Sequence, residues 1–490
     1  MGVCSSKKID SNNTGLRVCE EDCIGVAKAN PTWELLLPNS YNSFGAKYDA
    51  VSRTTINPSR QNKKGAYTNI QAEAGFEIDL TMDNMTKLLQ GFFFANAISQ
   101  PNTKNISTTI VADFDGIAST FKINVPLPNG IKVGDKIFVS GFKNKNNNGC
   151  KVVTDVSNDS LKVEGLLLPE SSNNAYIIKV GFDCKCSITA NVNDHSTIEL
   201  KNNTSNFIVG EWVYLTGLAI GNVFVRIASV VNKTTYKIDK SSLPLETVTN
   251  VNISVYQGTI IRNEQNPDKI VKKSYQFERT LGNDANGVQA EYIIGAVANE
   301  LTIDVPSADK VKTSLAYVAT GYETRTGLQG LKPGNRVNPI YDEEAINTSV
   351  DFSRLSMNVM RNGIVQKDLF MYATDLKLSI KNNVSANNAI GVFGAIDVTA
   401  GIFDVSCSIT AYFTTVESQQ AIKNNEDVAI DMIILKNNKG LIFDLPLVSS
   451  NGGEISVALN EPVTVPLENN AAESQFGYTL LFMQFDYLPS

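Results

Sequence analysis

The sequence predicts a mainly β fold. It consists of two β-barrel or sandwich domains with one helix each, and two small all-β barrels inserted into the first domain. Three observations support this prediction. Short segments rich in Val, Ile and Phe alternate with polar residues along most of the chain, which is typical of half-buried strands. One segment recurs in a second copy. The segments on either side of that repeat share an order of strand, helix and strands.

The repeat is clearest where Ile131–Phe142 reads IKVGDKIFVSGF and Phe207–Leu218 reads FIVGEWVYLTGL. Each copy is followed by a second alternating stretch. Gly134 and Gly210 occupy matched positions, where a tight turn with positive φ suits glycine. A repeat of this length indicates a duplicated folding unit. The two inserted repeats are expected over residues 115–190 and 191–258.

The flanking segments form one interrupted domain and one continuous domain. In the first, the alternating strand Gly75–Leu80 precedes a helix whose apolar residues recur at helical spacing. In the second, the strand Gly401–Ser406 precedes a helix expected from Tyr412 to Lys423. We interpret the two as diverged copies of one domain. Chance matching of short strand patterns is the alternative. The domains are expected over residues 31–114 with 259–325, and over residues 351–490.

Three polar segments lack periodicity. Residues 1–30 are interpreted as a flexible N-terminal arm. Residues 39–70 and 322–350 are interpreted as long loops, and residues 326–350 also link the two domains. Loops of this length are usually functional or intermolecular. We therefore expect the arm and the loops to become ordered only in an assembly.

Composition excludes several classes of protein. The chain has 490 residues, is 42% hydrophobic and carries a net charge of −7, which argues against a basic nucleic-acid-binding face. No apolar run approaches the length of a membrane span, so no membrane anchoring is expected. The seven cysteines are odd in number and irregularly spaced, which indicates reduced thiols. The first six residues fit a myristoylation pattern, but a plain flexible terminus is the preferred interpretation.

Residues for catalysis are missing from the sequence. His195 is the only histidine and lies in a polar turn, so a catalytic triad or a histidine-based metal site cannot be assembled. Phosphate-loop and nucleophile-elbow motifs are absent. The carboxylates Glu77 and Asp79 alternate with apolar residues, which indicates a solvated sheet face rather than an acid–base pair. The sequence therefore predicts a protein that is not an enzyme and has no cofactor and no metal.

An ordered set of segments in the flanks resembles the tail tube (major tail) proteins of long-tailed bacteriophages. The set covers much of both flanks but contains no single diagnostic motif. The two inserted repeats resemble small β-barrel modules that decorate phage structural proteins. The segments that carry the resemblance are Trp33–Leu37 with Arg53 and Arg60, Gly75–Phe94, Ser274–Thr280, Ala298–Ile303, Asn347–Ser349, Leu376–Asn383, Gly401–Phe413 and Thr479–Pro489.

The resemblance implies a structural protein of the virion tail, made in the host bacterial cytoplasm. Such subunits form stacked rings around a lumen through which the genome passes without specific binding. Related tubes have six tube domains per ring, so a duplicated chain implies three chains per ring. The implied partners are the chain itself, the tape measure protein, the baseplate and the tail terminator or head-to-tail connector.

The resemblance also suggests which residues face the lumen. Glu77, Asp79 and Asp404 lie on the polar face of strands that the family places near the inner sheet. The alternative is that they point outward or toward a neighbouring chain. The inserted repeats are expected at the outer wall.

Two other functions stay open. One is a baseplate or decoration subunit, and the other is a carbohydrate-binding protein of the tail surface. Aromatic residues at the loop tips of the repeats would favour carbohydrate binding, but the tip Lys143–Gly149 is rich in Asn and Lys.

Overall fold

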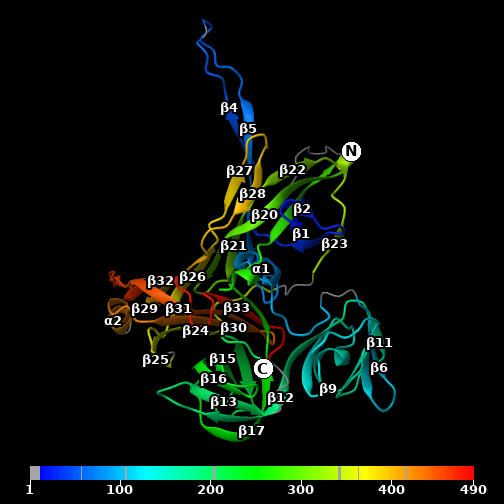
Figure 1. Cartoon of the computed structure of the whole chain (residues 1–490), viewed down its shortest axis with the longest axis vertical. Coiled ribbons are helices and arrows are strands. Elements are labelled where there is room, and N and C mark those ends of the chain that lie inside the picture. Colours follow the sequence, from blue (N-terminus) through cyan, green and yellow to red (C-terminus); the bar gives the residue numbers. More distant parts are fainter. Residues whose placement is uncertain are drawn as a thin grey trace.

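The computed structural model describes residues 11–56, 58–104, 108–201, 206–339, 344–361, 364–413 and 416–489. Within these ranges the chain is mainly β, as predicted, with one sheet of 19 strands, one of 12 strands and a separate two-stranded hairpin. Two short α-helices accompany them. A long hairpin projects at one end of the molecule and the inserted modules lie at the other end (Figure 1).

The 19-stranded sheet is made of two copies of the same set of elements. The first copy contains β1 (Gly15–Cys23), β3 (Thr32–Leu36), β4 (Ser40–Val51), β5 (Ala66–Asp79), α1 (Thr86–Phe93), β19 (Ser274–Asp284), β20 (Gly287–Pro306), β21 (Lys312–Ala319) and β22 (Gly321–Arg325). The second contains β24 (Phe352–Arg361), β25 (Ile364–Asp368), β26 (Ala373–Lys381), β29 (Asp404–Tyr412), α2 (Glu417–Lys423), β30 (Val428–Lys436), β31 (Lys439–Gly452), β32 (Thr464–Ala471) and β33 (Leu481–Phe485).

The strand pairings of the two copies correspond one to one. The antiparallel pairs β1–β19, β1–β3, β4–β5, β5–β21, β19–β20, β20–β21 and β20–β22 recur as β24–β30, β24–β25, β26–β29, β29–β32, β30–β31, β31–β32 and β31–β33. A shift of register even recurs, between Tyr41 and Ser43 in β4 and between Ala373 and Asp375 in β26. The predicted duplication of the domain is therefore confirmed, and chance matching is excluded.

The two copies are joined by one further pairing. β20 of the first copy pairs with β26 of the second, from Glu300 opposite Lys381 to Pro306 opposite Asp375. The apolar sides of both copies share one continuous core. Helix α1 contributes Leu88, Leu89, Phe92 and Phe93 to that core, and it ends at Phe94, which adopts a left-handed conformation with φ of 47°.

The inserted segment forms the 12-stranded sheet, which is built of two barrel-like modules. The first module contains β6 (Ile110–Phe114), β7 (Ser119–Ile123), β8 (Asp135–Ser140), β9 (Gly149–Val156), β10 (Ser160–Val163) and β11 (Glu170–Ser172). The second contains β13 (Ser196–Lys201), β14 (Trp212–Thr216), β15 (Val223–Val230), β16 (Thr235–Ser241) and β17 (Val248–Tyr256). The long strand β12 (Tyr176–Thr189) belongs to both, and with the second module it closes a six-stranded barrel.

The turns of the two modules match as the repeat predicts. Gly134 and Gly210 have φ of 89° and 84°. The carboxylate of Asp135 accepts a hydrogen bond from the backbone N–H of Lys132 at 2.8 Å, and that of Glu211 accepts one from Ile208 at 2.9 Å. The positive φ at both glycines is the conformation that the sequence predicted.

The second module is docked against the second copy. Its residues Trp212, Tyr214 and Phe224 pack on the side of β30, β31 and β33 that faces away from the shared core. Arg226 of the module lies in the same contact and binds Asp444 at 2.8 Å and Asp239 at 2.9 Å, with all three side chains buried. Removing one member would leave an uncompensated buried charge, so this network fixes the orientation of the module.

Three expectations for the polar segments require correction. Within the expected flexible arm, Gly15–Cys23 forms β1 and pairs with β19, because Leu16 and Val18 are buried in the core. Residues 1–10 lie outside the described residues. Residues 39–70 are not one long loop. Most of them belong to β4 and β5, which pair as a hairpin up to Val51 opposite Ala66. The polar composition of this hairpin reflects exposure of both faces of β4 in its outer half, from Lys47 onward.

The third correction concerns the linker and the second helix. Residues 322–339 contain the end of β22 and the short strand β23 (Asn335–Val337), which pairs with β3.

Helix α2 begins at Glu417 rather than at Tyr412. Residues up to Tyr412 continue β29 instead, because alternating side chains as far as Ala411 are buried between β26 and β32.

Candidate functional site

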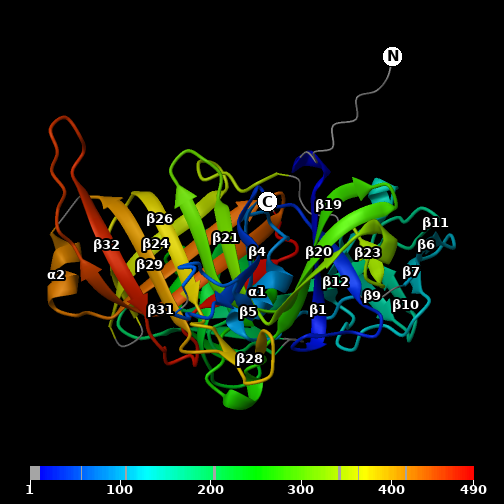
Figure 2. The ribbon, with the colours of Figure 1, turned by 90° about the horizontal axis from the view of Figure 1, so that it is seen from above.

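A polar face runs across both copies of the duplicated domain. It is the outward side of β5, β21, β20, β26, β29 and β32, which are paired in that order. Residues directly opposite each other in a sheet point to the same side. One row across this face consists of Glu77, Ser314, Thr302, Ser379, Ser406 and Asn470. Figure 2 shows the strands of this sheet side by side.

The alternate residues of the same strands form the core. Phe76, Ile78, Ile303, Leu378 and Ile409 are each 3% exposed or less. The strands are therefore half-buried, as the alternation around Glu77 and Asp79 predicts. Because the core fixes this alternation, the side chains of the polar face are held on one surface.

Carboxylates outnumber ammonium groups on the polar face. The carboxylates belong to Glu73, Glu77, Asp79, Glu300, Asp304, Asp375, Asp404 and Glu468, and the ammonium groups to Lys310, Lys312, Lys377 and Lys381. The remaining positions include Ser and Thr, whose hydroxyl groups hydrate readily. The surface is thus hydrophilic with an excess of negative charge.

Two of these four ammonium groups, on Lys310 and Lys381, have carboxylate partners on the same face. The Nζ of Lys310 lies 2.6 Å from Asp79, and this hydrogen bond raises the pKa of Lys310. Lys381 lies 3.2 Å from Glu300. Asp79 also accepts a hydrogen bond of 2.6 Å from Asn39. These lysines are therefore engaged by carboxylates on their own sheet.

The three residues singled out from the sequence lie on this one surface. Glu77 and Asp79 are half-buried on β5, and Asp404 is exposed on β29, opposite Lys381. The sequence did not identify Glu300, Asp304 or Lys377 as members. Their strands alternate visibly, but their place beside Asp404 depends on the pairing of β20 with β26, for which the sequence contains no local signal.

Nucleophilic and metal-binding groups are scarce in the described part of the chain. It contains no cluster of His, Cys, Asp and Glu residues that could hold a metal ion. Burial raises the pKa of the Cys184, Cys186 and Cys407 thiols to about 12, so these side chains stay protonated and unreactive at neutral pH. Among the described helices, neither is long and apolar enough to cross a bilayer.

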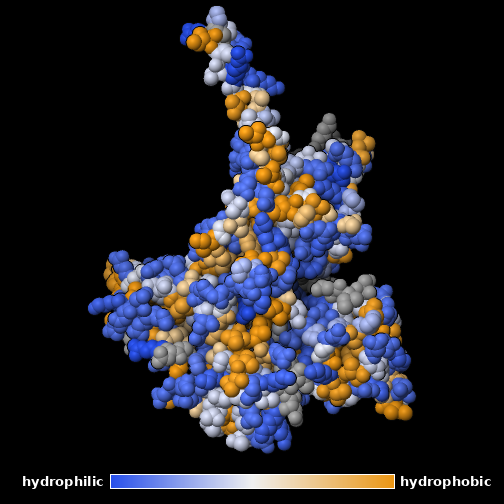
Figure 3. Space-filling view, viewed as in Figure 1, coloured by the Kyte–Doolittle hydropathy of each residue, from blue (hydrophilic) through white to orange (hydrophobic). Residues whose placement is uncertain are grey.

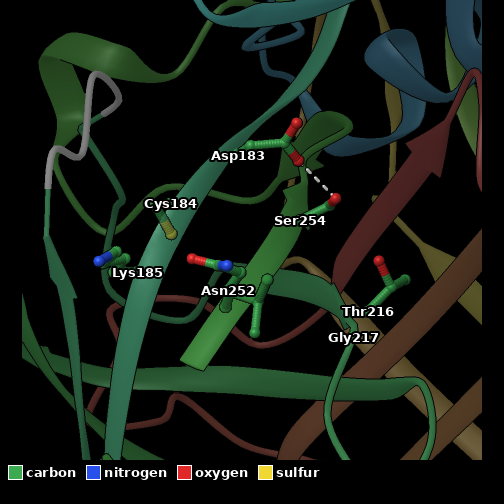
Figure 4. A pocket seen from close by; sticks show the side chains of 8 residues that line it. Asp183, Cys184, Lys185, Thr216, Gly217, Asn252 and Ser254 are labelled. Atoms are coloured by element: carbon green, nitrogen blue, oxygen red, sulfur yellow. Dashed lines mark hydrogen bonds between the residues drawn. The ribbon is translucent and has the colours of Figure 1, made fainter. Parts of the chain in front are cut away.

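The second module carries a shallow polar groove of about 430 Å³ (Figure 4). Asp183, Lys185, Asn252 and Ser254 contribute to its lining, and Ser254 donates a hydrogen bond of 2.5 Å to Asp183. None of the residues that line it is aromatic. Sugar rings commonly stack on aromatic side chains, so the groove offers no specific support for carbohydrate binding.

Comparison with known proteins agrees with the fold. A family model described as phage tail tube protein matches residues 11–471. A comparison with curated proteins gives no match. Since the family match covers nearly the whole chain, the chain belongs to the phage tail tube protein family.

Proposed function

We propose that the chain polymerises into stacked rings of three, whose polar faces line a lumen through which the phage genome passes. The observation that carries this proposal is the continuous polar face, which both copies build and which is rich in carboxylates. In this proposal each chain supplies two tube domains, and six tube domains surround the lumen.

The layering of the molecule supports the assignment of inside and outside. Behind the polar face come the shared core, then β30, β31 and β33, and then the second module. The polar face and the inserted modules therefore lie on opposite sides of the core. With the polar face toward the lumen, the modules project from the outer wall and do not obstruct the channel.

The charge of the polar face suits transit without binding. Carboxylates repel the DNA phosphates at short range, and at physiological ionic strength this field is screened beyond about 8–10 Å. Lys310 and Lys381 are paired with Asp79 and Glu300, so they offer little free positive charge to a phosphate. A hydrated wall of this kind keeps the duplex centred and lets it slide.

The proposal includes the partners implied by a tail tube. These are the tape measure protein, the baseplate and the tail terminator or head-to-tail connector, with the genome as a transient occupant. Localisation in the virion tail follows from the same role.

Electron microscopy of the purified chain tests this function. We expect long hollow tubes or, before nucleation, monomers that form such tubes when tail components are added. Discrete rings or monomers that never elongate in their presence would instead favour a baseplate or decoration subunit. Binding to a glycan array without tubes would favour the carbohydrate-binding alternative.

A further inference from the structure

We propose that neighbouring chains join by antiparallel strand pairing between the free edge of β4 in one chain and residues 453–458 of the next. This inference rests on the proposed ring and names its contact. Within one chain the two copies are already joined by β20 and β26. The contact between chains would repeat that pairing with the corresponding segments.

The first edge belongs to β4, the counterpart of β26. β26 pairs with β29 on one side and with β20 on the other. β4 pairs with β5, and its other edge pairs with no strand among the described residues. The shared register shift aligns Ser43 with Asp375, so Ala46 corresponds to Leu378 and Tyr48 to Ile380.

The second edge follows β31, the counterpart of β20. β31 ends at Gly452, and residues 453–458 lead from there to a turn that the hydrogen bond from the Glu461 N–H to the Ala458 carbonyl closes. Phe76 with Leu315 on β5 and β21 corresponds to Ala411 with Val465 on β29 and β32. The isolated bridge between Ser456 and Thr464 then corresponds to Thr302 opposite Ser314. Residues 454–458 thus correspond to Glu300–Asp304, within the part of β20 that pairs with β26.

Apolar exposure marks both edges as incomplete. Ile303 and Val305 of β20 are 0% and 7% exposed, within the core that also holds Leu378 of β26. Val457, the counterpart of Ile303, is 75% exposed, and Leu459 in the turn that follows is 90% exposed. Each edge lacks the apolar partner that its counterpart has inside the chain.

The apolar side of β4 offers such a partner. Tyr48, the counterpart of Ile380, is 47% exposed, and Phe44 and Ala46 are half-buried at the margin of the core. Figure 3 shows apolar residues along the hairpin that β4 and β5 form. Burial of these side chains against those of residues 453–458 would extend the core across the junction.

The internal pairing also fixes the register. Ser379 lies opposite Thr302, and Leu378 lies opposite Ile303. By correspondence, Lys47 of one chain lies opposite Ser456 of the next, and Ala46 lies opposite Val457. The contact uses two different edges, so it is heterologous. Such a contact generates a ring when the rotation between neighbours closes, as the proposed ring of three requires.

Disulfide trapping tests this register. In a Lys47→Cys, Ser456→Cys chain, both thiols lie on the solvated face, and directly opposite Cα atoms fall within the disulfide range of about 4.4–6.8 Å. We expect oxidised tubes to yield covalent dimers and trimers on a denaturing gel. Ser43→Cys with Ser456→Cys, four residues out of register along β4, and each single variant should yield none; the single variants also control for the exposed native Cys23.

A second variant tests the proposed contact through its effect on assembly. Val457→Asp changes an exposed residue, so the unfolding free energy of the free chain should move by no more than about 0.5 kcal/mol. We expect it to abolish ring formation. Ile117→Asp, at a 93% exposed residue of the first module, should assemble normally.

The possible outcomes test the contact between chains and the tube function separately. Tubes without the Lys47–Ser456 cross-link, or tubes formed normally by Val457→Asp, would overturn the contact and leave the tube role intact. Equal cross-linking of the out-of-register pair would also overturn it. Failure of the unmodified chain to form tubes with its tail components would count against the tube role itself.

Discussion

Asp404 and Asp79 illustrate how single residues set the charge of the polar face. Asp79 is paired with Lys310 and held by Asn39, whereas Asp404 is exposed opposite Lys381. Glu77 lies between these extremes, half-buried with Ser314 and Ser40 opposite it. Exposed carboxylates contribute most of the field that a passing duplex would meet, because they are neutralised least.

Charge reversal at two of these residues tests their role. In phage carrying Glu77→Lys and Asp404→Lys, we expect tubes of normal length but slower genome release, because phosphates would bind the new ammonium groups. DNA ejection can be followed in vitro by the fluorescence of a DNA-binding dye. Glu246→Lys, at an exposed residue of the second module, is the matched control and should eject normally. Unchanged release by the double variant would contradict a lumenal position.

Glu211 provides a pH-dependent contribution to stability. It is buried at the turn of the second module, and burial raises its pKa to about 7. An unfolded glutamate titrates near pH 4.3, so the folded chain binds this proton more tightly. The resulting stability is complete below about pH 4 and is lost as pH rises through about 7, by on the order of 3 kcal/mol.

Replacement of this carboxyl by an amide should remove the effect. We expect Glu211→Gln to resemble the protonated side chain, keeping an acceptor for the Ile208 N–H. Its unfolding free energy should therefore fall less between pH 5 and pH 8 than that of the unmodified chain. Denaturant titrations at both pH values measure this, with Glu246→Gln as an exposed control. Parallel pH profiles would contradict the assignment.

At the scale of elements, the outer half of the β4–β5 hairpin has few packing contacts with the rest of the described fold. It projects beyond the sheet beside the hairpin of β27 (Ser385–Asn388) and β28 (Ala395–Thr399) (Figure 1). The rings of Tyr48 and Phe393 stack with centroids 6.3 Å apart. Val51 and Ile56 are 63% and 108% exposed.

Hydrogen exchange should report this difference between elements. In the free chain we expect rapid exchange in the outer half of the hairpin and slow exchange in β30 and β31, whose two faces are both buried. In assembled tubes the hairpin should become protected, while β30 and β31 stay slow. Equal protection of the hairpin before and after assembly would contradict an intermolecular role.

The sequence predicted some elements well for identifiable reasons. The helical spacing of apolar residues, among them Leu88, Leu89 and Phe92, predicted α1. The alternation around Glu77 predicted β5 and its polar side. β4 was missed because its outer half is exposed on both faces and is rich in polar residues. The start of α2 was placed too early because the aromatic residues after Ile409 can suit either a helix or a strand.

At the scale of the whole molecule, the internal repeats carried the most information. The repeat at Ile131 and Phe207 predicted two related modules, and the order of elements in the flanks predicted the duplicated domain. The polar face as one surface could not be predicted, because it depends on long-range pairing of β20 with β26. The docking of the second module through Arg226 and Asp444 was also beyond prediction, since these residues are 218 positions apart.

The duplication explains how one chain can present a continuous wall. The pairing of β20 with β26 joins the two copies within one chain by backbone hydrogen bonds, and the proposed pairing of β4 with residues 453–458 would repeat it between chains. The second module lies behind the opposite sheet, held by a buried charge network, so it adds mass without interrupting the polar face.

A cryo-electron microscopy reconstruction of the assembled tube tests most directly whether the polar faces of both copies line one lumen. We expect three chains per ring, with Glu77, Asp304 and Asp404 on the inner wall and both inserted modules on the outer wall. A ring of six chains, or an inner wall formed by any surface other than the polar face, would contradict this arrangement.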